Sequence, residues 1–423
     1  MIPAEHIYII IDLKSFYASV ECVERGLDPM TANITIADAE RGLGTIYLAI
    51  TPNMKKLGIK NRCRLFEIPS FVKFITAVPR MQLYIDYAAR IYEVYLKYIA
   101  KEDIFVYSID EAFMEVTPYL ALYKTTPKEL ALRIMADIRS TVGITATCGI
   151  GTNLFLAKIA LDILAKHVPD HIGILDEAAY HQTLWTHQPL TDFWMIGHGT
   201  ARKLEQYGIT TMQQIAQRPP SLLHKLFGVN AEILIDHANG REPTTIADIK
   251  AYRPQSHSLA NGQVLPRNYS YEEGLLIIKE MADQLCLDLV DQELVTDSVT
   301  LYVGYAYNPI AADQPMHATA RLPMLTNSSR MITHHLTELY QAKINRSKSI
   351  RRISINANRV VPESCMQTSL FSPHDTDERE NARQRAILAI KKRFGSNAIF
   401  RGMDMLDPAT TLERNNQIGG HKK

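Results

Sequence analysis

The first third of the chain alternates short apolar runs with amphipathic segments. Residues 7–11 read IYIII and end at Asp12, which predicts a buried strand with an acid at its tip. Residues 15–26 then predict a short helix that ends at Gly26. Two short strands around a polar turn are predicted within residues 33–50.

Further helices and strands are predicted in alternation up to residue 166. Helices are expected at 79–100, 126–143 and 152–166, where apolar residues recur every three or four positions. Residues 104–116 predict a strand, a tight turn and a second strand, and residues 144–151 predict another strand. Without the inserted short strands, this order is that of a split βαβ unit with an antiparallel sheet. In that topology the first strand lies beside the turn pair.

The pattern changes from about residue 174. Short helices and the pair Pro219–Pro220 follow, and residues 191–217 contain a Gly-His-Gly turn between two helical segments. Residues 241–256 are polar and contain proline, which predicts a linker.

Strand alternation returns in a separate module from about 255 to 360. Strands are predicted at 295–307 and 349–360, and a helix at 271–290 precedes them. These elements predict a module of the α+β class. Residues 361–384 are again typical of a linker, and a basic helix and a polar tail follow them.

Composition places the chain among soluble globular proteins. It has 423 residues, too many for one ordinary core, with 46% hydrophobic and 22% charged residues. No apolar run is long enough to cross a bilayer, and the start lacks the features of a secretory signal. Five scattered cysteines without CxxC spacing argue for a reducing compartment and against disulfides or a zinc site.

Positive charge is concentrated locally although the net charge is only +1. The segment 321–360 contains many lysines and arginines but one acid, Glu338. Such a basic face is found in multidomain proteins that bind nucleic acid. A solvated charged surface explains the count equally well. The basic residues are Arg321, Arg330, Lys343, Arg346, Lys348, Arg351, Arg352 and Arg359.

Three acids, Asp12, Asp110 and Glu111, lie at the ends of apolar strands. Removing a carboxylate from water is costly unless it is paired or binds a metal. Hard oxygen ligands suit Mg²⁺ holding a triphosphate, and two ions would orient an attacking hydroxyl and stabilise a leaving oxygen. Acids at sheet ends that face water and cap turns are the alternative, with about even weight.

Other candidates are less specific on their own. Phe16 and Tyr17 beside the first acid are ordinarily core residues of a short helix. Lysines near Gly58 and on the helix at 152–166 suit phosphate binding but are usually surface residues. These lysines are Lys55, Lys56, Lys60, Lys158 and Lys166.

The segment 195–209, MIGHGTARKLEQYGI, carries a more specific signal. A hairpin of this kind points backbone N–H groups outward at a helix N-terminus, which suits a DNA phosphate and is blind to sequence. A tight turn between helices, with Thr200 as the helix cap, is the alternative.

Two motifs together, IDLKSFYASVE and YSIDEAF, resemble those of the Y-family translesion DNA polymerases, in the UmuC-like (ImpB/MucB/SamB) branch. The resemblance spans nearly the whole chain. It implies an α+β multidomain fold, a right-hand polymerase with a ferredoxin-like palm, small fingers, a helical thumb with a helix-hairpin-helix and an α+β little finger. The implied boundaries are palm 1–19 and 80–173, fingers 20–79, thumb 174–245, little finger 255–360 and a C-terminal tail 361–423.

The resemblance also implies roles for particular residues. It makes Asp12, Asp110 and Glu111 catalytic metal ligands, with the Leu13 carbonyl as a further ligand. Tyr17 becomes the steric gate against a ribose 2′-hydroxyl. The other nucleotide-binding residues would be Phe16 beside the gate, Lys55 and Lys166. The DNA-binding residues would be Gly197, Gly199, Thr200, Lys203, Arg351 and Arg352.

The chain departs from the family pattern at three positions. Many relatives have a second acid where this chain has Lys14, a position that is not usually counted as a ligand. Pro52 replaces a tyrosine, which removes one hydroxyl that could contact phosphate. Lys55 replaces an arginine, so a point charge stands where relatives have a bidentate fork.

The segment QTSLF resembles the peptide by which bacterial polymerases dock on the sliding clamp. An extended linker would offer Leu370 and Phe371 to an apolar pocket, and Gln367 and Ser369 to polar groups. An ordinary linker that contains an apolar pair is the alternative.

These observations favour a low-fidelity, template-directed DNA polymerase that copies past DNA damage by two-metal nucleotidyl transfer. The expected cofactor is Mg²⁺, two ions, with Mn²⁺ as a substitute. The expected partners are primer–template DNA, a dNTP, the bacterial sliding clamp and SOS accessory proteins, with no membrane. The expected location is the bacterial cytoplasm, at the nucleoid.

Two other functions compete with this one. One is a different metal-dependent nucleotidyl transferase or cyclase on a similar palm, which would need neither the thumb hairpin nor the little finger. The other is a catalytically inactive repair accessory protein that binds DNA and the clamp, which would not need all three acids.

Overall fold

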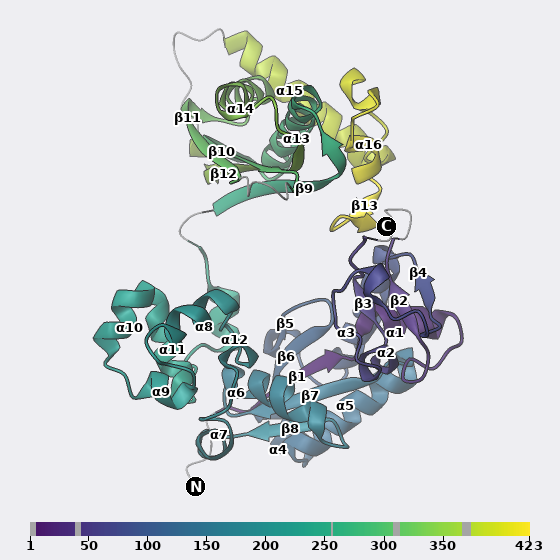
Figure 1. Ribbon diagram of the computed structural model, residues 1–423, viewed down its shortest axis with the longest axis vertical. Helices are drawn as coiled ribbons and strands as arrows, with labels where there is room; N and C mark the ends of the chain where they lie inside the picture. The colour runs from purple at the N-terminus through teal and green to yellow at the C-terminus, as the bar shows by residue number, and fades with distance from the viewer. Residues whose placement is uncertain (1–5, 39–43, 255–256, 308–313, 366–373) are drawn as a thin grey trace. The chain divides into compact units, whose positions relative to one another are not determined.

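The computed structural model describes residues 6–38, 44–254, 257–307, 314–365 and 374–423. The chain forms two compact units, Met1–Tyr252 and Arg253–Lys423 (Figure 1). Both contain helices and sheets, so the predicted α+β multidomain class is confirmed. Within the described residues no helix has the length and apolarity needed to span a membrane.

The first unit is organised around a five-stranded sheet in the order β5-β6-β1-β7-β8. The central strand β1 runs antiparallel to β6 on one side and to β7 on the other, while β8 runs parallel to β7. The apolar run at 7–11 is therefore the middle of the sheet, as its fully buried isoleucines require. The strands are β1 (Tyr8–Leu13), β5 (Ile104–Val106), β6 (Glu111–Glu115), β7 (Ala146–Gly151) and β8 (Ile172–Leu175).

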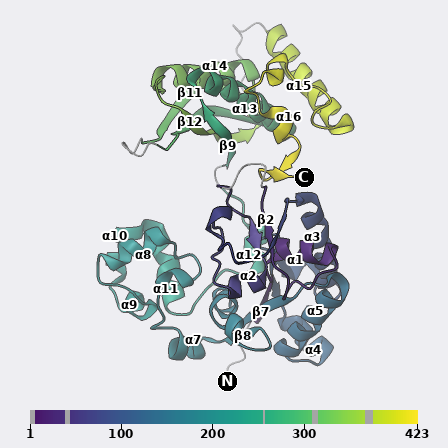
Figure 2. The ribbon, with the colours of Figure 1, turned by 45° about the vertical axis from the view of Figure 1, so that its right-hand side comes forward.

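Helices cover both faces of this sheet. Tyr8 and Ile10 pack with residues of the segment that begins with α6 (Leu154–Ile159). On the other face, α3 (Met81–Leu96) and α5 (Pro127–Val142) lie side by side (Figure 2). The helix α4 (Thr117–Tyr123) precedes α5.

The close packing of α6 on β7 depends on two glycines. A Cβ added to Gly149 would lie 2.0 Å from the backbone oxygen of Ala157, and one added to Gly151 would lie 2.2 Å from its backbone nitrogen. The α-helix ends at Ile159 and continues as a π turn over Ala160–Leu164. The helix predicted for 152–166 is therefore present, but its second half has π and 3₁₀ geometry.

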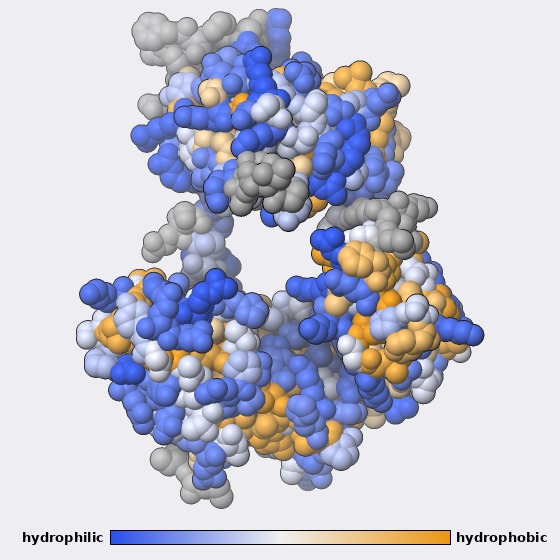
Figure 3. Space-filling view, viewed as in Figure 1, coloured by the Kyte–Doolittle hydropathy of each residue, from blue (hydrophilic) through white to orange (hydrophobic). Residues whose placement is uncertain are grey.

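The segment predicted as fingers forms a small three-stranded sheet. The strand β2 pairs antiparallel with β3 and parallel with β4. Its surface exposes large apolar side chains, among them Phe66 and Phe71, the latter 81% exposed. Figure 3 shows hydrophobic residues gathered over this region. The elements are α1 (Phe16–Glu24), β2 (Ile34–Ile36), β3 (Ala49–Ile50), α2 (Pro52–Lys56) and β4 (Ile75–Ala77).

Short helices follow the sheet, as the sequence predicts. They share a core that includes Phe155, Tyr180 and Leu204. The helices are α7 (Glu177–Thr183), α8 (His198–Glu205), α9 (Met212–Ala216), α10 (Pro220–Phe227) and α11 (Ala231–Ala238).

The linker predicted at 241–256 is wrong in its central part, which forms helix α12 (Ile246–Ala251). Thr245 caps the helix by accepting from the Asp248 backbone N–H, and the Asp248 carboxylate accepts from the Thr245 N–H. Ile246 is buried in the same cluster as Tyr8 and Ile10. The hydrogen bonds of this capping box and the burial of Ile246 stabilise a helix here although most of the segment is polar.

The second unit contains a four-stranded antiparallel sheet in the order β11-β10-β12-β9. The helices α13 and α14 pack together and bury residues such as Ile353 and Ile355 of β12. The predicted strands and first helix are present, but β9, β11 and α14 were not predicted. The elements are β9 (His257–Tyr269), α13 (Tyr271–Asp291), β10 (Leu294–Tyr305), β11 (Met316–Thr326), α14 (Ser329–Lys343) and β12 (Ile350–Pro362).

The C-terminal segment packs on this unit. Its long helix α15 (His374–Phe394) begins inside the stretch predicted as a linker, so that prediction is wrong from residue 374 onward. The buried Glu280 carboxylate accepts from the backbone N–H of Thr410 at 3.0 Å, which ties the end of the chain to α13. A short helix α16 (Thr411–Arg414) and the strands β13 (Gln417–Ile418) and β14 (His421–Lys422) complete the chain.

Candidate active site

The sheet brings the three predicted acids together although they are far apart in sequence. Asp12 of β1 lies directly opposite Glu111 of β6 in the antiparallel register. The Leu13 N–H donates to the Asp110 carbonyl at 3.0 Å, so the tight turn before β6 is fixed to the end of β1. The structure thus places Asp12, Asp110 and Glu111 together, where β1 ends and the neighbouring strand β6 begins.

Burial and mutual repulsion disfavour the charged forms of Asp12 and Glu111. The pKa of Asp12 is raised to about 7, by desolvation first and then by the charges of Glu111 and Asp110. Desolvation also raises the pKa of Glu111 above its ordinary value, against the effect of Lys158. A second positive group, such as a bound cation, would relieve this cost.

The sequence indicated Lys158 only as one of several lysines that could bind phosphate, whereas the structure pairs it with one of the three acids. Lys158 is only 6% exposed and projects from α6, and its Nζ donates to both Glu111 oxygens at 2.8 and 3.0 Å. The same ammonium lies 3.2 Å from an Asp162 oxygen one turn further on. The available signal was a single lysine inside the apolar run LFLAKIALDIL, because a buried lysine needs an acidic partner.

The carboxylates do not converge on one point as they stand. Among the residues that the structure describes, no three His, Cys, Asp or Glu side chains lie close enough to hold a metal ion. The Glu111 carboxylate is turned to Lys158, and Asp110 accepts from the Ser108 hydroxyl at 2.6 Å. The three side chains nevertheless fit a divalent cation, because carboxylate oxygens are hard ligands. When these carboxylates are ionised, the nearby positive charge does not balance them, and a cation would.

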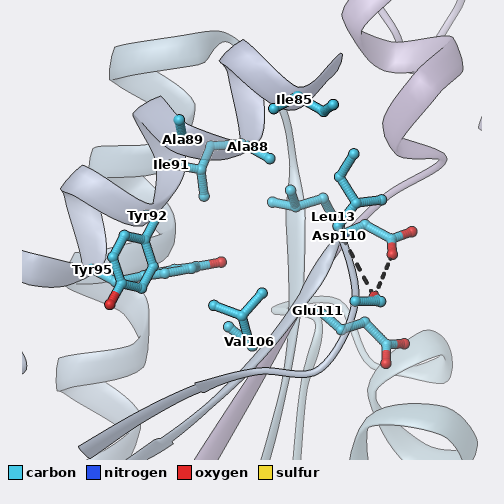
Figure 4. Close-up of a pocket in the computed structure, with 13 residues that line it drawn as sticks. Leu13, Ile85, Ala88, Ala89, Ile91, Tyr92, Tyr95, Val106, Asp110 and Glu111 are labelled. Atoms are coloured by element: carbon cyan, nitrogen blue, oxygen red, sulfur yellow. Dashed lines mark hydrogen bonds between the residues drawn. The ribbon is translucent and has the colours of Figure 1, made fainter. Parts of the chain in front are cut away.

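A mainly apolar pocket of about 370 Å³ lies behind the acids, between α3 and the turn that joins β5 to β6. Ile85 and Ala88 of α3 face Leu13 and Val106 across it (Figure 4). Asp110 and Glu111 direct their carboxylates away from α3, so the polar side of the turn is opposite to the helix (Figure 4).

The two aromatic residues after β1 differ in accessibility. Phe16 is 2% exposed and belongs to the core, whereas Tyr17 is half-buried. The Tyr17 ring lies 4.8 Å from the ring of Tyr84, whose hydroxyl donates to the buried Glu21 carboxylate at 2.9 Å. Of the predicted aromatic pair, only Tyr17 is placed where it could meet a ligand.

Several lysines surround the acids. Lys55 and Lys166 interact electrostatically with one another, and both act on Asp12. Lys166 lies 3.9 Å from an Asp162 oxygen, which is a weak pair. Lys14 lies against the His171 ring, with its Nζ 3.0 Å from Nε2. The site therefore has an acidic centre with a basic border.

The predicted hairpin is asymmetric. A 3₁₀ turn over Leu190–Asp192 precedes it, and α8 begins at His198 with Gly197 as its N-cap. Gly199 and Thr200 lie inside α8, so Thr200 is not the helix cap. No side chain caps the helix, and a Cβ added to Gly197 or Gly199 would meet no atom within 4 Å. The first-turn N–H groups are thus open to a ligand.

Lys203 is exposed, like the hairpin glycines, but its ammonium already has partners within the chain. Its Nζ donates to the Leu226 carbonyl and lies 5.1 Å from the centre of the Phe227 ring. These contacts tie α8 to the end of α10, which gives Lys203 a structural role beside any contact with DNA.

The basic residues of the second unit differ in their pairing. Arg321 and Arg359 lie near Asp297, the latter at 2.7 Å, so part of the counted positive charge is neutralised. Arg352 is exposed on β12, and its guanidinium lies 5.6 Å from the Tyr302 ring centre. Arg351 is the unpaired residue of a bulge, since both ladders pass from Ile350 to Arg352.

The predicted clamp-binding residues Gln367, Ser369, Leu370 and Phe371 lie outside the described residues.

Comparison with known proteins matches two parts of the chain to one family. The impB/mucB/samB family model matches residues 11–162, and its C-terminal domain matches residues 256–370. The first match contains all three acids, and the second contains the four-stranded sheet. Together they cover more than half of the chain.

Relatives extend this similarity over the whole length. UvrX, a Bacillus subtilis (strain 168) protein named for UV-damage repair, is 29% identical, over 98% of this chain and 97% of the relative. DNA polymerase IV 2 of the same organism is also 29% identical, over 99% of both chains.

A solved structure has the same fold. The Y-family DNA polymerase chimera Dbh-Dpo4(243-245)-Dbh superposes with a TM-score of 0.64 at 19% identity, covering 84% of this chain and 99% of that one. The chain therefore belongs to the impB/mucB/samB family.

Proposed function

We propose that this chain is a template-directed DNA polymerase that adds deoxynucleotides to a primer. The observation that carries the proposal is the register that sets Asp12 against Glu111, with Asp110 fixed to the end of the same strand. Three acids at the ends of neighbouring strands, surrounded by lysines, suit a reaction between a hydroxyl and a triphosphate.

Two Mg²⁺ ions, or Mn²⁺ in their place, would supply activation of the primer hydroxyl and stabilisation of the departing pyrophosphate. Asp12, Asp110 and Glu111 would hold them, together with the Leu13 carbonyl. Glu111 must turn from Lys158 to take part, and Lys158 would then still pair with Asp162 at 3.2 Å. Lys158 would thus pair with Glu111 when no cation is bound and remain paired with Asp162 when Glu111 turns away.

Nucleotide selection is assigned to the residues around the acids. Tyr17, half-buried and backed by Tyr84, would exclude a ribose 2′-hydroxyl. Lys55 and Lys166 would contact the triphosphate, since both lie within electrostatic reach of Asp12. Phe16 acts indirectly, as a core residue whose ring lies 5.6 Å from that of Tyr17.

DNA binding is assigned to the hairpin and to the second unit. The open N–H groups at Gly197, Gly199 and Thr200 would receive a backbone phosphate, and Lys203 would support them. Arg351 and Arg352 would contact the duplex backbone, so binding should weaken steeply with salt.

The biological role follows from the family. We infer low-fidelity synthesis past DNA damage, supported by the UV-damage repair name of one relative. Docking on the sliding clamp through Gln367, Ser369, Leu370 and Phe371, cooperation with SOS accessory proteins, and action at the nucleoid in the bacterial cytoplasm belong to the same proposal.

Primer extension with the purified chain and Mg²⁺ tests the activity. Asp110→Ala should lower the rate of extension by about a thousandfold or more, because a ligand that acts in the transition state is lost. Extension that survives in this variant would defeat the assignment. An inactive wild type that still binds DNA would instead favour an accessory protein.

A second experiment tests the steric gate. Tyr17→Ala should raise ribonucleotide incorporation relative to deoxynucleotide incorporation, because the excluded volume near the sugar is removed. The rate with deoxynucleotides serves as the control, and an unchanged preference would remove the gate assignment.

A further inference from the structure

Lys14 places an ammonium beside the acids, where its closest polar contact is an imidazole. Its Nζ lies 3.0 Å from Nε2 and 3.2 Å from Nδ1 of His171. Asp12 attracts this ammonium, while burial and the charge of Lys56 oppose its charged form. An anionic ligand would add to the attraction by Asp12 and stabilise the half-buried charge.

The surroundings of Lys14 add to this positive charge. Lys56 at the end of α2 acts on it by repulsion, while Lys55 and Lys166 lie on the same border of the acids. Four ammonium groups are therefore arranged around one acidic centre. The acids attract these cations, but the cations also repel one another, and a bound polyanion would relieve that repulsion.

His171 is held in a conformation that fixes its position. Its φ is +58°, in the left-handed region that few residues other than glycine adopt. Two backbone hydrogen bonds hold it there, one from its N–H to Val168 and one to its carbonyl from Cys148. Such strained residues occur preferentially at functional sites. The imidazole of this residue lies in contact with the Lys14 ammonium.

We propose that Lys14, positioned by His171, binds the β- and γ-phosphates of the incoming nucleotide. This inference rests on the proposed polymerase function and adds a residue at a position where many relatives carry an acid. The α-phosphate belongs at Asp12 and Asp110, where the primer hydroxyl attacks. The ammonium groups around the acids would then be available to bind the β- and γ-phosphates.

Nucleotide binding tests the proposal without turnover. The full chain is assembled with primer–template DNA and Mg²⁺, and the Kd of a non-hydrolysable α,β-imido dNTP is measured. Lys14→Gln should raise this Kd about tenfold, the usual loss for one charge-assisted hydrogen bond. Lys14→Arg should keep most of the affinity, because the charge remains.

A matched control removes an unrelated charge from the same unit. Lys97→Gln breaks an exposed pair with Asp137 and should leave the Kd unchanged. Inhibition by pyrophosphate should weaken in Lys14→Gln by a similar factor, whereas binding of a dNMP should not change. His171→Gln should give a smaller rise in the dNTP Kd at the same melting temperature.

The outcomes separate this inference from the function beneath it. An unchanged dNTP Kd in Lys14→Gln, or a loss confined to DNA binding, would overturn the Lys14 assignment and leave the polymerase intact. A wild type that neither binds the analogue nor extends a primer would overturn the proposed function, and with it this subsite.

Discussion

The acidic centre of the first unit and the basic strand β12 of the second carry charge in opposite ways. At the centre, the Lys158 side chain is 7% exposed and is paired with Glu111 and Asp162. On β12, Arg352 is exposed to water and lies over the Tyr302 ring. The acidic centre holds a few charges that are shielded from water and therefore interact strongly with one another. Strand β12 carries charges that water screens, so each of them interacts weakly.

This difference bears on how each region could work. Buried charges interact strongly because little water screens them, so one substitution should change both stability and chemistry. Exposed charges are screened and replaceable, so their effect on stability is small and their effect on DNA binding is collective. Substitutions in the two regions should therefore differ in size and in salt dependence.

Removing the cation at the acidic centre should have the largest effect. Lys158→Met leaves Glu111 and Asp162 without their partner, and the free energy of unfolding should fall by about 3 kcal/mol. Adding Mg²⁺ should recover part of the loss, because a bound cation replaces the missing charge. Chemical denaturation with and without Mg²⁺ measures both effects.

The control for this prediction is an exposed lysine. Lys97 pairs with Asp137 at 3.1 Å but is 55% exposed, so Lys97→Met should cost less than about 1 kcal/mol. Equal losses in the two variants would show that burial does not set the strength of the Lys158 pair.

Neutralising Asp12 at the same centre should raise the free energy of unfolding, whereas the loss of Lys158 should lower it. The pKa of Asp12 is about 7 in the folded chain, against about 4 when unfolded. The folded state therefore holds a proton more tightly, and stability declines as the pH rises from about 4 to about 7. Above that range, Asp12→Asn should be more stable than the wild type by about 1–3 kcal/mol without metal.

The pH dependence supplies the control. Well below pH 4 the two proteins should be equally stable, since Asp12 is then protonated in both the folded and the unfolded state. At about pH 8, Mg²⁺ should stabilise the wild type more than the variant. A constant difference between the proteins at every pH would contradict the assigned titration.

The sequence predicted the first unit better than the second for a physical reason. Its strands are buried apolar runs bounded by turns, so the β1, β6 and β7 assignments follow from pattern alone. The strands β9 and β11 alternate between exposed and mostly only partly buried positions, so their sequences lack the continuous apolar run that marks β1. The helix α12 was missed because its anchor, Ile246, is one residue in a polar segment.

The site shows the same limit. Acids at strand tips could be identified because they interrupt apolar runs, but the partner of each acid depends on the fold. Lys158 and Asp162 meet Glu111 only because α6 packs against β7 through Gly149 and Gly151. The sequence likewise counted Arg359 as free charge, since Asp297 lies outside the basic segment.

The smallest effect on stability is expected on β12. Arg352→Gln should change the free energy of unfolding by less than about 0.5 kcal/mol, because the guanidinium is exposed and makes no ion pair within the described chain. Binding to primer–template DNA should weaken, and the slope of log Kd against log salt should fall by about 1. Titrations at several salt concentrations give this slope.

The same strand provides the matched variant. Arg359 is held by both Asp297 oxygens at 2.7 and 2.8 Å, so its charge is already compensated. Arg359→Gln removes the same charge from β12 but should alter the salt slope less than Arg352→Gln does. If the two variants lose equal slope, the pairing with Asp297 does not withdraw Arg359 from DNA. The basic strand would then act through its total charge, and the accessibility of individual arginines would not matter.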